Sequence, residues 1–184
     1  AFASAIANDY ASASVTAHGV HQRAYAEWDN ASADVENDGT ISALAVSNAW
    51  GGTTGAYDTA VPATAAYASA EAAGVEQDVS ARLTATASLT NSSDFSIHGN
   101  AYASAYASQN AEAVAYGAGV WQDTYSETST AENFVDNSGY IQADASAYAS
   151  ATTADGDASA YAFANGVGQS VFGEEGGTNC FTNS

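Results

Sequence analysis

A short motif, Gly-Val-x-Gln, occurs four times along the chain and constrains its fold more than any other feature of the sequence. The valines of the four copies are 55, 45 and 47 residues apart. Self-similarity at a period of roughly 20–50 residues indicates that one supersecondary unit is stacked on the next. The four copies are Gly19-Val20-His21-Gln22, Gly74-Val75-Glu76-Gln77, Gly119-Val120-Trp121-Gln122 and Gly166-Val167-Gly168-Gln169.

A second motif recurs in fixed phase with the first. It consists of an apolar residue, any residue, an asparagine and then Asp or Ser, and it begins 14 or 15 residues after the valine of each Gly-Val-x-Gln copy. Its four asparagines are Asn37, Asn91, Asn137 and Asn183. Two motifs in fixed phase predict a single repeat domain over residues 1–184, with four units of about 46 residues. The approximate units are 1–36, 37–90, 91–136 and 137–184.

The interval between the first and second copies of the Gly-Val-x-Gln motif is longer than the others. Its extra residues fit best at 51–62, a stretch that is rich in glycine and contains Pro62, the only proline. Gly and Pro together indicate a loop, and insertions in repeat proteins map to loops on one face, often the binding face. We expect a loop insertion at 51–62, either a binding loop or a tolerated insertion without function.

Between the motifs the sequence alternates with a period of two. Over 101–108 alanine occupies every odd position and Tyr or Ser every even position, and 83–87 and 143–151 alternate in the same way. A helix would place these alanines all round its surface, whereas a strand places them on one side. The Thr, Val and Tyr partners also favour strands. The chain is therefore predicted to be all-β, despite the helix propensity of alanine.

Two of the motif asparagines have a glycine two residues later, Gly39 and Gly139, and these sites are predicted to be turns because Asn and Gly tolerate positive φ. Ile41 and Ile141 lie two residues after the glycines and are predicted to point inward. The segment Leu89–Phe95 keeps the same spacing, with a serine in the glycine position. One asparagine per unit could stack into a ladder of side chains, which is a structural role.

Equivalent residues that recur in phase favour a parallel β-solenoid with a narrow, alanine-rich core. A solenoid coil usually takes roughly 20–30 residues per turn, so a unit of this length is either two coils or one large coil. The alternative is an antiparallel β-meander, or layered sheet, with one multi-stranded leaf in each repeat.

The charge of the chain excludes several classes of partner. Only Arg23 and Arg82 oppose 21 carboxylates, which gives a formal net charge of −19. Phosphate would be repelled, so nucleic acid is not an expected partner, and anionic membrane surfaces are disfavoured for the same reason. No apolar run approaches the roughly 20 residues needed to cross a bilayer.

No pattern typical of an enzyme stands out, and we expect no catalytic residue and no cofactor. His18 and His21 lie three residues apart without an evident third ligand, so we interpret them as surface histidines in a loop. Carboxylates at Asp155–Asp157 and Glu174–Glu175 could offer oxygens to Ca²⁺, but the calcium-binding nonapeptide is absent, and we expect no metal site. Cys180 is the only cysteine, and burial is favoured over an intermolecular disulfide.

The turn pattern, apolar-x-Asn-(Asp/Ser)-Gly-x-Ile followed by alternating alanine, resembles the repeats of bacterial β-solenoid surface proteins. These include autotransporter passengers and filamentous-haemagglutinin-like adhesins. The resemblance lies in Val35–Ala43 and Val135–Ala143, with weaker matches at Leu89 and Phe181. It implies secretion to the extracellular space or cell surface, a rod-like shape and a role in adhesion or surface structure.

Neither end of the chain shows the atypical capping repeat that solenoids normally need. We expect the ends to be covered by copies of the same chain, head to tail, or by further repeats. The absence of an initiator Met and a signal peptide suggests a processed form or an excised segment. The leading functional hypothesis is a structural subunit or segment of an extracellular filament, surface layer or biofilm matrix that assembles end to end.

Two other functions are weighed against this one. The first is an adhesin or glycan-binding rod, which would bind surface glycans through rows of exposed tyrosines or through the loop at 51–62. The second is an ice-binding protein, which would need a flat face of regularly spaced threonines. Only Thr84 and Thr86 hint at such a face.

Overall fold

The computed structural model describes residues 1–7, 10–51, 65–152 and 155–184, and within these ranges the chain forms twelve β-strands and no helix. No described segment is therefore a helix that could span a membrane. The strands are β1 Phe2–Ala7, β2 Tyr10–Ala26, β3 Ala31–Asn37, β4 Thr40–Gly51, β5 Ala65–Ala81, β6 Ala85–Asn91, β7 Ser96–Ala107, β8 Asn110–Ser126, β9 Thr130–Asn137, β10 Tyr140–Ala151, β11 Asp157–Gly173 and β12 Gly176–Asn183.

The strands form three parallel sheets of four strands each. Sheet A has the order β1-β4-β7-β10, sheet B the order β2-β5-β8-β11, and sheet C the order β3-β6-β9-β12. Every described pairing is parallel, and the valines of the four Gly-Val-x-Gln motifs lie beside one another in sheet B. The predicted parallel β-solenoid is thus confirmed, and one repeat unit forms one large coil.

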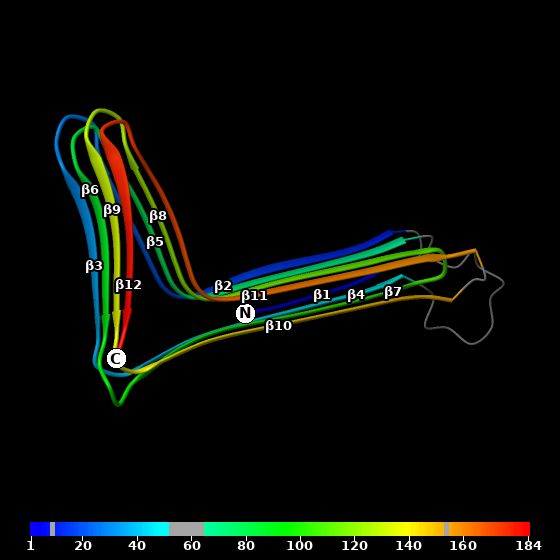
Figure 1. Ribbon diagram of the computed structural model, residues 1–184. Helices are drawn as coiled ribbons and strands as arrows, with labels where there is room; N and C mark the ends of the chain where they lie inside the picture. Colours follow the sequence, from blue (N-terminus) through cyan, green and yellow to red (C-terminus); the bar gives the residue numbers. More distant parts are fainter. Residues whose placement is uncertain (8–9, 52–64, 153–154) are drawn as a thin grey trace.

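Each coil is L-shaped in cross-section (Figure 1). The strands of sheet B are 17 residues long and bend near their middle. The first half of sheet B packs against sheet A to form one arm, and the second half packs against sheet C to form the other. Sheet B therefore lines the inner side of the L, and the Gly-Val-x-Gln motifs lie at the bend, which we call the elbow.

The core of the first arm consists almost entirely of alanine. Its sixteen buried hydrophobic residues are all alanines from sheets A and B. Alternation explains this composition, because every second residue of each strand faces the opposite sheet. In β7, for example, Ala101, Ala103, Ala105 and Ala107 are buried, whereas Tyr102 and Tyr106 are exposed. The second arm has a mixed core of alanine and valine.

The larger aliphatic side chains gather at the elbow. Their buried cluster contains Val75, Val120, Leu89, Val135 and Ile97, so it draws on all three sheets. A bend opens a wider space between sheets than two thin parallel layers do, and only large side chains fill such a space to the density of a protein interior. The valine of each motif is therefore a core residue of the elbow.

The motif glycine permits close packing at the same place. A Cβ on Gly74 would lie 2.5 Å from Cγ2 of Ile97 and 2.6 Å from the carbonyl oxygen of Gly119, where no side chain fits. Alternation in sheet B also shifts by one residue here. The inward residues of β5 are Ala66, Ala68, Ala70 and Ala72, and then Val75, Gln77, Val79 and Ala81.

Three expectations from the sequence change in the structure, and a fourth is not tested by it. Ile97, rather than Phe95, lies in register with Ile41 and Ile141, because the turn after Asn91 is two residues longer than the turns after Asn37 and Asn137. No described non-glycine residue has positive φ, and Gly176 is the one described glycine that does, so the turns at Gly39 and Gly139 do not depend on it. Cys180 is exposed, because β12 is an edge strand. The insertion predicted at 51–62 lies, from residue 52 onward, outside the described residues.

We predict that Gly74→Ala lowers the free energy of unfolding by about 1–3 kcal/mol, because the added methyl group overpacks the elbow against Ile97. Gly166→Ala is the matched control. It changes the same motif position in the last coil, where a Cβ meets no atom within 4 Å, and we expect a change within about 0.5 kcal/mol. Urea unfolding followed by tryptophan fluorescence measures both variants, and equal losses would contradict this role for the motif glycine.

Candidate functional site

Each end of the described stack is formed by edge strands. In the described structure β1, β2 and β3 form one end and β10, β11 and β12 form the other, and each of these strands pairs with a neighbour on one side only. We call these surfaces the first face and the last face. On the last face every residue of β12 is exposed, including Phe181. An edge strand presents unpaired N–H and C=O groups and is a template for pairing with another chain.

A column of glutamines runs through the stack from one face to the other. The Nε2 of Gln77 donates to Oε1 of Gln22 at 3.0 Å, that of Gln122 to Gln77 at 2.9 Å, and that of Gln169 to Gln122 at 2.8 Å. Gln77 and Gln122 are fully buried. Each glutamine also donates to a sheet C carbonyl of its own coil, for example Gln122 to Phe134 at 3.0 Å.

A column of asparagines runs beside it with the opposite polarity: the glutamines donate to the preceding coil, whereas the asparagines donate to the following coil. Asn37 donates from Nδ2 to Oδ1 of Asn91 at 2.7 Å, Asn91 to Asn137 at 2.7 Å, and Asn137 to Asn183 at 2.6 Å. Asn37, Asn91 and Asn137 are buried. The side chains at these turn positions are thus hydrogen-bonded along the stack, and this explains asparagine at a site that does not need positive φ.

Opposite polarity makes the two faces complementary in hydrogen bonding. On the last face, no described hydrogen bond reaches Oε1 of Gln169 or leaves Nδ2 of Asn183. On the first face, Gln22 uses one N–H on the carbonyl of Asp34 and keeps a second, while Oδ1 of Asn37 accepts only from the N–H of Gly39. An amide nitrogen has two donors and an amide oxygen two lone pairs, so each face offers what the other lacks.

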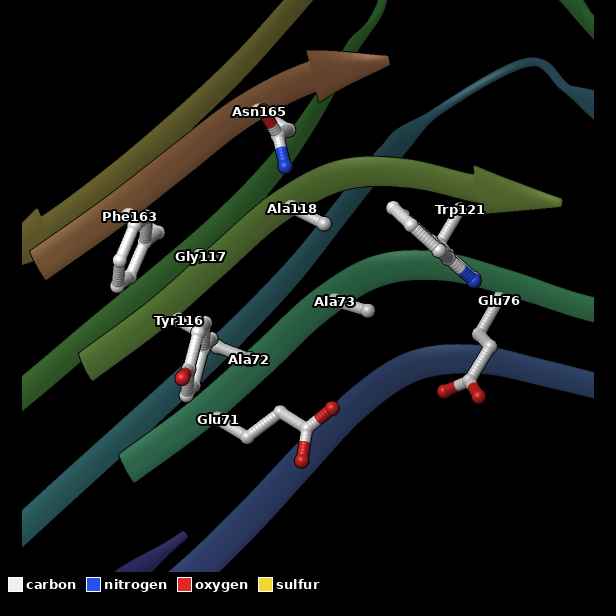
Figure 2. A pocket seen from close by; sticks show the side chains of 10 residues that line it. All are labelled: Glu71, Ala72, Ala73, Glu76, Tyr116, Gly117, Ala118, Trp121, Phe163 and Asn165. Atoms are coloured by element: carbon white, nitrogen blue, oxygen red, sulfur yellow. The ribbon is translucent and has the colours of Figure 1, made fainter. Parts of the chain in front are cut away.

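A second candidate surface is a hollow on the inner side of the elbow (Figure 2). It has a volume of about 340 Å³. The aromatic and polar residues that line it are Glu71, Glu76, Tyr116, Trp121, Phe163 and Asn165, from β5, β8 and β11. Tyr116 and Phe163 stack with ring centroids 5.3 Å apart and an interplanar angle of 10°. We call this surface the elbow hollow.

The exposed tyrosines form pairs and short groups rather than long rows. Tyr125 stacks on Phe172 with ring centroids 5.4 Å apart, and Tyr106 lies 5.4 Å from Tyr148. The register breaks longer rows. In the first two coils the positions equivalent to Tyr116 hold Thr16 and Glu71. The stacked aromatic pairs on the exposed side of sheet B therefore lie in the last two coils.

Beside the hollow, the structure brings together residues that the sequence alone did not connect. His18 and His21 belong to strand β2, not to a loop, and Glu76 of β5 lies next to them. Glu76 is far from both histidines in the sequence and becomes their neighbour because β2 and β5 pair with His21 beside Glu76. A repeat alignment that stacks the Gly-Val-x-Gln motifs directly would have revealed this pair.

No protein-family model, curated protein or solved structure matches this chain.

Proposed function

We propose that this chain is a structural subunit that assembles head to tail into an extracellular filament. The observation that carries the proposal is the complementarity of the two faces in both backbone edges and amide side chains. An end-on copy would place its β1, β2 and β3 beside β10, β11 and β12 of its neighbour. All three sheets would then continue across the junction. In sheet A, β1 is half the length of β10 and would pair with the second half of that strand.

The geometry of such a contact favours open growth. The first and last faces are different surfaces, so their contact is heterologous, and a heterologous contact that does not close into a ring produces a filament. The glutamine and asparagine columns would add directed hydrogen bonds at each junction, from Gln22 of one copy to Gln169 of the next and from Asn183 back to Asn37. A copy turned upside down would bring antiparallel strands together at the junction, unlike every described strand pair within the chain.

The negative charge of the chain favours single filaments over bundles. The net charge of −19 is spread over a chain with two cationic side chains, and one of these, Arg23, already pairs with Asp78 at 3.2 Å. Self-repulsion of this size opposes lateral association. The extracellular setting is proposed from the resemblance of Val35–Ala43 and Val135–Ala143 to bacterial surface solenoids, and a surface layer or biofilm matrix is its natural context.

We predict that Asn183→Asp raises the critical concentration for assembly at least about tenfold, equivalent to about 1.4 kcal/mol at the junction. The substitution removes the free donor on the last face and places a carboxylate against the acceptor oxygen of Asn37 of the next copy. The bond from Asn137 to this side chain survives, because a carboxylate oxygen also accepts. Sedimentation and light scattering over a concentration series measure assembly.

Asn48→Asp is the matched control for this experiment. It makes the same change of charge on the outer side of β4, an interior strand of sheet A, and should assemble like the wild-type protein. A wild-type protein that stays monomeric at high concentration, or equal effects of the two substitutions, would contradict head-to-tail assembly.

A glycan-binding rod is a second candidate, and the elbow hollow is the observation that favours it. Trp121, Tyr116 and Phe163 are 38–51% exposed, so part of each ring is accessible to a ligand even though Tyr116 and Phe163 stack on each other. Carboxylates at Glu71 and Glu76 could accept hydrogen bonds from sugar hydroxyls while the C–H face of the ring packs on an aromatic side chain. A few polar groups among apolar ones is the composition of a small-molecule site.

We predict that Trp121→Ala weakens the binding of any soluble polysaccharide at least about tenfold, since loss of a buried aromatic contact costs about 1.4 kcal/mol or more. Trp28→Ala is the control, because Trp28 lies in the connection between β2 and β3, away from the elbow hollow. Its ring packs against Arg82, with 4.9 Å between the guanidinium carbon and the ring centroid. A panel of neutral and amino-sugar polysaccharides, tested by affinity electrophoresis, provides the measurement. Equal mobility shifts in both variants would contradict a role for the elbow hollow.

A further inference from the structure

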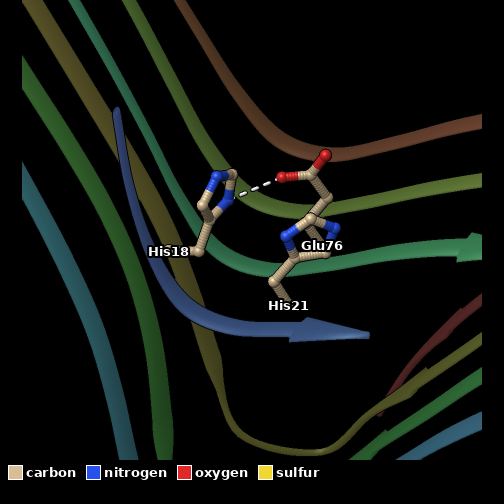
Figure 3. A group of neighbouring side chains, drawn as sticks. All are labelled: His18, His21 and Glu76. Atoms are coloured by element: carbon tan, nitrogen blue, oxygen red, sulfur yellow. Dashed lines mark ion pairs between the residues drawn. The ribbon is translucent and has the colours of Figure 1, made fainter. Parts of the chain in front are cut away.

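We propose that His18, His21 and Glu76 form a binding site for a transition-metal dication of the Zn²⁺ class, beside the elbow hollow. The three side chains come from two adjacent strands at the elbow, and one potential ligand atom from each lies within 4.8 Å of the other two (Figure 3). The proposal does not depend on head-to-tail assembly, because all three residues belong to one chain and to its first two coils.

The bend in β2 is what places the two histidines on one surface. In a straight strand, residues three apart point to opposite faces. In β2 the alternation shifts by one residue at the elbow, so Ala17 and Val20 both face inward while His18 and His21 both face outward. Their ring centroids are 4.9 Å apart. The shift at Gly19 thus creates the pair of nitrogen ligands.

The distances fit a small dication with minor side-chain movement. Zn²⁺ binds His nitrogen and carboxylate oxygen at about 2.0–2.2 Å, and a tetrahedral arrangement then separates the ligand atoms by about 3.3 Å. The Nδ1 of His18 lies 2.6 Å from Oε2 of Glu76, which is shorter than this separation. All three potential ligand atoms lie within 4.8 Å of one another, so none is far beyond it. The side chains of His18 and Glu76 are 25% and 22% exposed, so an ion would be partly shielded from water.

An outer carboxylate is already placed to orient one of the ligands. Nε2 of His21 lies 3.3 Å from Oδ2 of Asp78, and Arg23 contacts the same oxygen at 3.2 Å. Metal-binding histidines usually donate their second ring N–H to a carboxylate, which fixes the tautomer and raises the basicity of the other nitrogen. If His21 donates from Nε2 to Asp78, its Nδ1 lone pair remains for the metal.

The ligand set selects the class of ion and the place of the site. Two imidazoles and one carboxylate suit Zn²⁺ and its neighbours, whereas Ca²⁺ prefers oxygen ligands only. Three protein ligands leave one tetrahedral position for water or another donor. Glu76 also lines the elbow hollow, so the site lies beside it. The equivalents of His18 in later coils are Ala73, Ala118 and Asn165, so the site occurs once among the described residues.

The test uses Zn²⁺ and Co²⁺ alone as probes of the full chain. Isothermal titration with Zn²⁺ in a large excess of Ca²⁺ should show one bound equivalent, since Ca²⁺ occupies the exposed carboxylates but not a site with two imidazoles. Co²⁺ should give the visible absorption of a tetrahedral complex. His18→Asn and His21→Asn should each weaken Zn²⁺ binding at least about 100-fold, and Asp78→Asn about 10-fold.

His98→Asn is the matched control, because His98 is the third histidine of the chain and lies on β7 against Tyr140, with ring centroids 5.7 Å apart. It should bind Zn²⁺ like the wild-type protein. Circular dichroism of each variant shows whether the fold is kept, and loss of binding counts for the proposal only in folded variants. Complete displacement of Zn²⁺ by Ca²⁺, no binding at all, or equal loss in His98→Asn would overturn the site.

Discussion

The fold is constrained by the small free energy of burial that each alanine contributes to its core. Burial of a group the size of a methyl stabilises a protein by about 0.8 kcal/mol, whereas a fully buried Leu or Ile contributes about 1.5–3 kcal/mol. A core of alanine must therefore be broad to offset the loss of chain entropy, and this solenoid is broad, with one coil for each repeat unit of the sequence. Small side chains also keep each arm thin, because two strands of alternating alanine bring their sheets close together. The large aliphatic residues are confined to the elbow, where the sheets diverge.

The thin arms also favour stacking of the coils in register. Polar side chains that point into so narrow an interior bond to nearby backbone carbonyls and to their equivalents in adjacent coils, and Gln77, Gln122, Asn91 and Asn137 all bond along the stack. Buried amides left without partners would destabilise the fold, so each ladder penalises any slip of one coil on the next. The two ladders have opposite polarity and give the stack a direction, from which the proposal of head-to-tail assembly is drawn.

Much of this architecture could be predicted from the sequence. Period-two alternation predicts strands, and motifs that recur in phase predict parallel stacking, as the structure confirms. The elbow was not predicted, although its signal is present, since the inward positions change from odd to even at Gly19 and from even to odd at Gly74. The number of coils per unit could not be decided either, and without it the neighbour of His21 is unknown. Glu76 was therefore missed as the third member of the histidine cluster.

Cryo-electron microscopy of the native chain at high concentration tests the central claim, that open and complementary faces join copies into a continuous solenoid. Filaments with an L-shaped cross-section and a subunit rise of about 19 Å are predicted, because four coils at about 4.8 Å each separate equivalent points on successive copies. Discrete particles four coils thick, or filaments in which copies meet through the sides of their arms, would contradict it.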